Sequence, residues 1–151
     1  MAFPTPEEIA ADPRPRVRAS FSLVGDELNL GRCNAEIGVP PTDWGRKGEI
    51  RANRRCPIPE TFWKIMLDRC TWELEEVVAE LLDIVTPHQQ AIQRIRREGV
   101  ISAEINCVVE LYRDSVVLAL SEESIKRMAA LGLAFGLELY DYREDEDPPG
   151  W

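Results

Sequence analysis

The sequence predicts an α+β domain of the ferredoxin-like type, in which a mainly antiparallel sheet carries helices on one face. Segments that alternate apolar and polar residues, typical of strands, recur along the chain, and segments with apolar residues at helical spacing separate them. From residue 61 onward their order is strand, helix pair, strand, strand, helix, strand, which is the βαββαβ order. A strand and a helix before residue 40 extend this core.

The N-terminal extension contains one strand and one short helix. The strand is predicted at residues 17–23, since apolar and polar residues alternate strictly there. The helix is predicted from Asn29, a residue typical of helix N-caps, to Gly38, a typical C-terminal stop. Two prolines follow and prevent its continuation. The stretch that ends at Glu60 is rich in Pro, Gly, Arg and Asn without apolar periodicity, which indicates a long loop.

A strand and two helices follow the loop. The strand is predicted at residues 61–67, whose Trp and Phe favour that state. Residues 74–85 form the clearest helix, with an unbroken apolar stripe and outward-facing glutamates. The next helix is predicted to start at Thr86 as N-cap, with Pro87 in its first turn, and to run to Gly99. The two helices therefore meet at a corner.

The last part of the chain supplies three more strands and one helix. Strands at residues 101–112 and 116–120 are predicted to form an antiparallel hairpin around a turn at 113–115. A helix at residues 121–132 follows, and the last strand covers residues 133–140. Its predicted core face consists of Leu133, Phe135, Leu137 and Leu139.

The chain has the length and composition of one domain. Its 151 residues are 44% apolar and 30% charged, as is typical of a globular fold with its own core. We expect a flexible lead-in at residues 1–15, because four prolines interrupt it without any periodicity. A single α+β domain follows at residues 16–142. An acidic, mobile tail is expected at residues 143–151.

Composition also indicates the compartment and excludes some partners. The chain starts without a basic stretch before an apolar core, and no apolar run approaches the ~20 residues of a membrane helix. Four widely spaced cysteines suit thiols in a reducing cytosol. The net charge of −9 opposes binding to a phosphate backbone. We therefore expect a cytoplasmic protein that binds neither membranes nor nucleic acid.

Motifs typical of catalysis are lacking in the sequence. His88, the only histidine, lies at a predicted helix start with no partner at a usual ligand or triad spacing. The cysteines form no C-x₂-C pair, and Cys33 and Cys107 lie on apolar stripes, where a buried thiol is common. No glycine-rich phosphate-binding loop occurs. We therefore assign no catalytic, metal-binding or cofactor-binding residue.

Two surfaces are candidates for binding. The loop after Trp44 carries five cations against a single acid over residues 46–55. This basic loop could bind an anion or an acidic patch, although a solvated loop with Trp44 packed on the core explains the pattern slightly better. Its candidate binding residues are Trp44, Arg46, Lys47, Arg51, Arg54 and Arg55. The second surface is the uncovered sheet face, which is expected to carry Ser102, Glu104, Asn106 and Tyr112.

Four short motifs resemble those of a bacterial family named domain of unknown function 4279. They are Gly-Asp-Glu-Leu at residues 25–28, Glu-Ile-Gly-Val-Pro at 36–40, Arg-Lys-Gly-Glu at 46–49 and Gly-Leu-Glu-Leu at 136–139. The similarity covers residues 16–142, with a longer loop before the second strand than the family leads us to expect. The resemblance implies a small bacterial protein of this fold and brings no assigned catalytic residues.

Three functions are compatible with these observations. The first is a non-catalytic protein-binding module that acts through the uncovered sheet face or the basic loop, as an acidic partner or immunity-like inhibitor of a basic protein. The second is a sensor of a small anion at the basic loop. The third is an enzyme that uses Cys56 or Cys70 as nucleophile beside arginines. The oligomeric state is open, and strand edges could pair two chains into a homodimer.

Overall fold

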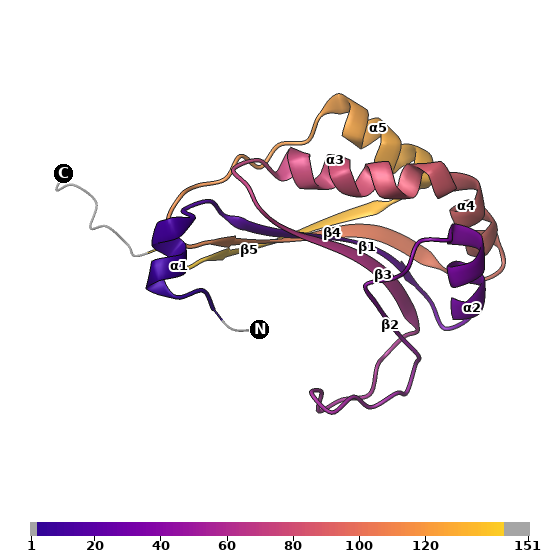
Figure 1. Ribbon diagram of the computed structural model, residues 1–151. Helices are drawn as coiled ribbons and strands as arrows, with labels where there is room; N and C mark the ends of the chain where they lie inside the picture. Colours follow the sequence, from indigo (N-terminus) through magenta and orange to yellow (C-terminus); the bar gives the residue numbers. More distant parts are fainter. Residues whose placement is uncertain (1–2, 144–151) are drawn as a thin grey trace, which may run out of the picture.

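A mixed sheet organises residues 3–143, the part of the chain that the computed structural model describes (Figure 1). Its strands are ordered β2-β3-β1-β4-β5. Their bounds are Arg16–Val24 for β1, Asp43–Gly45 for β2, Phe62–Cys70 for β3, Ser102–Leu111 for β4 and Ala134–Asp141 for β5. The acidic tail predicted at residues 143–151 lies outside the described residues except for Arg143.

Helices α3, α4 and α5 lie on one side of this sheet, and the loop between β2 and β3 lies on the other (Figure 1). The α+β class with helices on one face is therefore confirmed. The helical bounds are Pro6–Ala11 for α1, Leu30–Arg32 for α2, Cys33–Ile37 for the π-helical turn η1, Leu74–Val85 for α3, Thr86–His88 for the 3₁₀ turn η2, Gln89–Arg97 for α4 and Glu122–Leu131 for α5. None of the helices in residues 3–143 has both the length and the apolar composition that a bilayer crossing requires.

The strand order differs from the ferredoxin-like arrangement that the sequence predicted, which is not confirmed. β1 was expected as an extension of the core, yet it lies at the centre of the sheet and pairs antiparallel with both β3 and β4. β4 and β5 are parallel neighbours, joined across the helical face by α5. The central position follows from the side chains of β1, because those on its helical face are entirely buried: Val17, Ala19, Phe21 and Leu23.

The predicted hairpin after β4 is wrong for a local reason. Residues 116–120 do not join the sheet and instead run beside the start of α3. There the Val117 amide donates to the Trp72 carbonyl at 2.7 Å, and the Val117 carbonyl accepts from the Leu74 amide at 3.1 Å. Val116 and Leu120 pack against the core from this position. The alternation of apolar and polar residues at 116–120 thus arises because one side of this segment is buried, and not because the segment pairs with a strand of the sheet.

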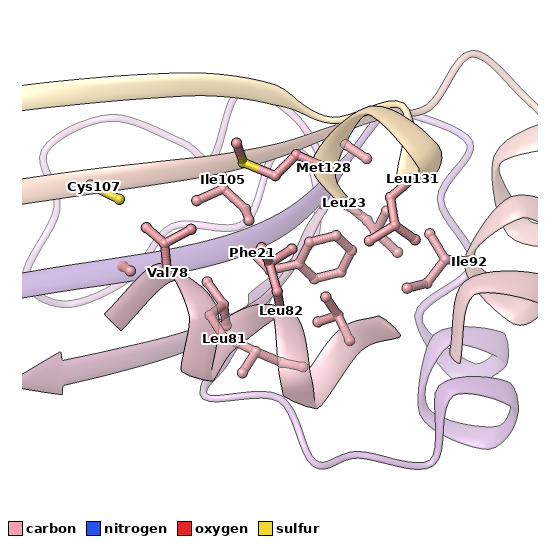
Figure 2. Close-up of a cluster of buried hydrophobic side chains, with 14 of the residues drawn as sticks. Phe21, Leu23, Val78, Leu81, Leu82, Ile92, Ile105, Cys107, Met128 and Leu131 are labelled. Atoms are coloured by element: carbon pink, nitrogen blue, oxygen red, sulfur yellow. The ribbon is translucent and has the colours of Figure 1, made fainter. Parts of the chain in front are cut away.

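The hydrophobic core lies between the sheet and the helices. Figure 2 shows Phe21 and Leu23 of β1 facing the side chains of α3, with Ile92 of α4 and Leu131 of α5 closing one end. The predicted stripe of α3 is confirmed, and its buried members are Leu74, Val77, Val78, Leu81, Leu82 and Val85. Each such side chain contributes about 1.5–3 kcal/mol of burial free energy, so α3 is a main source of stability.

Within the lead-in that the sequence predicts to be flexible, residues 6–11 form the short helix α1. α1 starts with a capping box, in which the Thr5 hydroxyl accepts from the Glu8 amide and the Glu8 carboxylate accepts from the Thr5 amide. Pro6 suits the first helical turn, because its missing N–H has no partner there anyway. The helix has only six residues, which is too short for a hydrophobic period to show in the sequence.

Candidate interaction surfaces

The long loop between β2 and β3 projects from the side of the sheet that the helices leave uncovered (Figure 1), and some of its residues line a pocket together with residues of the sheet. Two backbone hydrogen bonds close it on itself, from the Gly48 amide to the Ile58 carbonyl at 2.8 Å and from the Ile58 amide to the Glu49 carbonyl at 2.9 Å. The Ile58 side chain is 2% exposed. The loop is therefore an ordered wall beside the sheet and has a small apolar anchor of its own.

Gly45 allows this close approach. A Cβ at this position would lie 2.5 Å from Cδ1 of Ile58, 2.8 Å from Cε1 of Phe62 and 3.1 Å from a terminal nitrogen of Arg51. Gly45→Val is therefore expected to push the loop off the sheet and to lower the free energy of unfolding by about 1–2 kcal/mol. Urea unfolding measures the stability, and limited trypsin digestion reports whether the arginines of the loop become accessible.

Gly31→Ala is the matched control for Gly45→Val. A Cβ at Gly31 meets only the side-chain oxygen of Asn29, at 3.4 Å, which is ordinary contact. This variant should unfold at the same urea concentration as the wild type or at a slightly higher one, because alanine restricts the unfolded chain. Equal destabilisation by both variants would contradict the proposed role of Gly45.

Two of the predicted binding cations hold the loop in place. The Lys47 ammonium donates to Asp26 at 2.8 Å, and this hydrogen bond raises the pKa of Lys47. Arg51 donates to Asp43 at 2.9 Å and to the Trp44 carbonyl. These contacts anchor the loop at both sides. The same ion pairs neutralise Lys47 and Arg51, two of the cations that the sequence predicted to bind an external anion.

The other members of the predicted set are more accessible. Trp44 pairs with Trp63 in the sheet register, so its side chain lies on the helical side of β2, where 43% of the residue remains exposed. The Arg46 guanidinium lies 5.6 Å from the centre of the Trp44 ring as a cation–π contact. Arg54 and Arg55 are exposed, and within residues 3–143 neither side chain has an ion-pair partner. The predicted binding residues therefore do not form one site: Lys47 and Arg51 hold the loop in place, whereas the other four remain accessible.

The loop and the uncovered sheet face share one pocket with a volume of about 330 Å³. Arg54 lines it from the loop, and Glu104 lines it from β4, so members of both predicted surfaces meet here. Two further lining residues, Ser22 of β1 and Lys64 of β3, were missed by the sequence analysis. Both alternate with apolar residues in their strands, which signals the uncovered face but not a pocket.

The opposite end of the uncovered face is occupied by internal contacts. Arg16 forms a two-pronged ion pair with Asp68 at 3.0 and 2.6 Å, and the Arg16 guanidinium lowers the pKa of Asp68. Arg18 pairs with Glu110, which also accepts a hydrogen bond from the Tyr112 hydroxyl. Burial and this hydrogen bond raise the pKa of Tyr112. Tyr112 lies on this face as predicted, but as part of the structural network.

The cysteines give little support to nucleophilic chemistry. Burial raises the pKa of Cys33 and of Cys107 to about 11, as suits core thiols. Cys70 is exposed, but partial burial of its thiol and the nearby charge of Asp12 raise its pKa, which disfavours the reactive thiolate. Cys56 is exposed in the loop. Among the described residues, no three His, Cys, Asp or Glu side chains are grouped to hold a metal ion.

The edge strand β5 presents an apolar stripe to solvent. Phe135, Leu137 and Leu139 were predicted to form a core face, yet they are 40%, 40% and 48% exposed. They lie on the helical side, since their partners in β4 are buried residues. β5 pairs only with β4 along residues 3–143, so its other backbone edge is open. On α5, Ile125 is also 51% exposed.

Comparison with protein families matches residues 15–142 to the model described as Domain of unknown function (DUF4279). The chain belongs to this family. The DUF4279 match begins one residue before β1 and ends one residue after β5, so it contains the loop, the pocket and the open edge, whereas α1 precedes it. The comparison with curated proteins found no match, and the comparison with solved structures found none either.

Proposed function

We propose that this DUF4279 protein is a non-catalytic protein-binding module that adds a strand of a basic partner protein to the open edge of β5. The exposed stripe of Phe135, Leu137 and Leu139 carries the proposal. In recognition by strand addition, backbone hydrogen bonds at a sheet edge supply affinity, and alternate side chains supply specificity. β5 offers both over eight residues.

The edge of β5 lacks most of the usual protection against strand addition, since Glu138 and Asp141 are the only charged residues in the strand. Proteins guard exposed edges with lysines, prolines, bulges or very short strands. The sequence of β5, Ala-Phe-Gly-Leu-Glu-Leu-Tyr-Asp, contains no lysine and no proline. β5 pairs with β4 in an unbroken register from Ala134 to Asp141, without a bulge. An unguarded apolar edge of this length is typical of a surface that is covered in a complex.

Charge argues for a basic partner. The protein has a net charge of −9. Glu123 in the first turn of α5 and Glu138 in β5 form no ion pair among the described residues, whereas Glu122 pairs with Lys126 and Asp141 with Arg143. Such a field speeds the approach of a basic protein and opposes a second copy of the same chain. The proposal therefore favours an inhibitor-like or immunity-like role toward a basic protein.

Exposed thiols are compatible with a cytoplasmic location for this role. Cys56 and Cys70 are both free and exposed. Unpaired surface thiols persist in the reducing cytosol and are readily oxidised outside it. The family resemblance supports a bacterial source. Cell fractionation with an antibody to the native protein tests the location.

Leu137→Arg is the test variant for the β5 edge. It should weaken binding of the basic partner at least about tenfold, because it removes an apolar contact and repels a like charge. Affinity capture from the source cell identifies the partner, and calorimetric titration of the purified partner measures its affinity. Amide hydrogen exchange should show new protection along β5 in the complex, as strand pairing requires.

Ile50→Arg is the matched control, since Ile50 is 72% exposed in the loop beside the opposite edge of the sheet. It introduces the same side chain and should leave the affinity unchanged. An acidic partner would contradict the proposal, as would equal binding by wild type and Leu137→Arg. If sedimentation showed that the free protein self-associates through β5, the occupant of this edge would be a second copy of the chain and not a basic partner.

A further inference from the structure

The pocket between the loop and the uncovered sheet face contains a polar row that the internal contacts leave unused. Lys64, Ser22 and Glu104 are direct neighbours across β3, β1 and β4 in the sheet register. Adjacent strands are about 4.8 Å apart, so a cation, a hydroxyl group and a carboxylate follow one another across about 10 Å. All three residues line the pocket.

Among the described residues, the side chains in this row form no hydrogen bond or ion pair of their own. Ser22 is 5% exposed, and within residues 3–143 its hydroxyl group makes no hydrogen bond. In the same part of the chain, Lys64 and Glu104 form no ion pair with each other or with any other residue. The Lys64 ammonium instead lies 5.5 Å from the centre of the Phe62 ring. Polar groups left in this way can satisfy a ligand at little cost to the fold.

The charges that line the pocket are balanced. Arg51 neutralises Asp43, as described above. The remaining lining charges are two cations, Arg54 and Lys64, and two carboxylates, Glu60 and Glu104. The carboxylates would repel a ligand that carries only negative charge, and the arginine and the lysine would repel a ligand that carries only positive charge. A ligand with one charge of each sign and no net charge meets both requirements.

We propose that this pocket binds a small zwitterion, namely an α-amino acid with an apolar side chain. The ligand carboxylate accepts hydrogen bonds from Lys64 and Ser22, and its ammonium donates to Glu104. Ile58, Phe62 and Val24 supply the apolar part of the lining and contact the ligand side chain. The volume of about 330 Å³ is at the lower end of the range for small-molecule sites.

The site is built before any ligand arrives. The loop wall is held by the Arg51 to Asp43 ion pair at the pocket and by the Lys47 to Asp26 ion pair outside it. The Lys47 amide also donates to the Thr61 hydroxyl at 3.0 Å, which fixes the loop where it enters and leaves the sheet. A preformed wall lowers the ordering cost of binding.

The test is calorimetric titration of the purified full-length chain with L-phenylalanine and L-leucine. Two truncated probes, 3-phenylpropionate without the ammonium and phenethylamine without the carboxylate, separate the two charges. L-Phenylalanine should bind at least about tenfold more tightly than either truncated probe, because each lost charged hydrogen bond costs about this factor.

Two variants assign the charges to residues. Glu104→Gln should weaken L-phenylalanine about tenfold and bring its affinity close to that of 3-phenylpropionate. Lys64→Met should also weaken the binding of L-phenylalanine about tenfold and bring its affinity close to that of phenethylamine. Glu138→Gln is the control, because Glu138 lies on the same sheet face but outside the pocket, and it should bind like the wild type. Urea unfolding verifies that each variant is folded.

Three results would overturn the proposal. The first is the absence of binding heat with both amino acids, the second is equal affinity for L-phenylalanine and a truncated probe, and the third is an unchanged affinity in Glu104→Gln. Binding of 3-phenylpropionate alone would identify an anion site and would exclude the role of Glu104. None of these results bears on the apolar stripe of β5, which lies on the helical face and not on the uncovered face that lines the pocket.

Discussion

Trp63→Ala is expected to lower the free energy of unfolding by about 3–5 kcal/mol, the largest effect of any substitution considered for this protein. Trp63 lies in β3 with no exposed surface, and its ring meets Phe21 edge to face at a centroid distance of 6.5 Å. Its indole N–H donates to the side-chain oxygen of Asn34 at 2.9 Å. Alanine would leave a cavity and an acceptor without its donor.

Urea unfolding followed by far-UV circular dichroism measures this effect, because the remaining tryptophans complicate a fluorescence signal. Trp72→Ala is the control. Trp72 is 50% exposed, and its side chain makes a single hydrogen bond, to Asp114 at 3.3 Å, and a cation–π contact with Arg14. Its loss should cost less than about 1 kcal/mol. If the two variants unfolded at the same urea concentration, the packing assigned to Trp63 would be wrong.

Glu110→Ala is expected to cost about 2–3 kcal/mol, because it removes one partner of a largely buried ion pair. The side chains of Arg18 and Glu110 are 17% and 10% exposed. Without the carboxylate, Arg18 loses this counter-charge in the central strand, and the Tyr112 hydroxyl loses its acceptor. The expected cost is below that of a fully buried pair because water still reaches both groups.

Thermal or urea unfolding of Glu110→Ala should be compared with Glu104→Ala. Glu104 lies on the same strand and the same face but is exposed and forms no ion pair among the described residues. Its removal should change the free energy of unfolding by no more than about 0.5 kcal/mol. A similar small change in both variants would show that the network around Glu110 contributes little to stability.

The two proposed contact surfaces lie in different parts of one sheet. The amino-acid pocket uses β1, β3 and β4 on the uncovered face, near the loop that follows β2. The protein-binding edge uses β5 and its helical side. β4 contributes to both, since Glu104 lines the pocket while the Glu104 backbone pairs with Ala134 of β5. Because the pocket and the apolar stripe lie on opposite faces of the sheet, a partner on β5 and a ligand in the pocket can be studied independently.

Local sequence patterns correctly predicted most elements. The stripe of α3 has the period of a helix, the alternation of β4 has the period of a strand, and Gly132 ends α5 in a left-handed conformation with φ of 67°. Each of these signals depends only on nearby residues. The family membership was also predictable, because its motifs are short and continuous in sequence.

Other features required the tertiary structure, because periodicity shows which side of a segment is apolar and not what covers that side. The strand β5 and the central strand β1 have the same alternation, yet β1 is buried between two strands and β5 is exposed at an edge. The basic loop contains the predicted cations, but two of them are already paired. Lys47 pairs with Asp26, which is distant in sequence, and Arg51 pairs with Asp43 of the neighbouring strand β2. The pocket likewise joins residues from four separate segments.

What the sequence determined by itself is thus the class, the elements and the family. The tertiary structure alone decided the strand order, the exposure of β5 and the meeting of Lys64, Ser22 and Glu104 in one row. The physical reason is that secondary structure follows from local hydrogen bonds and periodic burial, whereas strand neighbours depend on how all the apolar faces pack together.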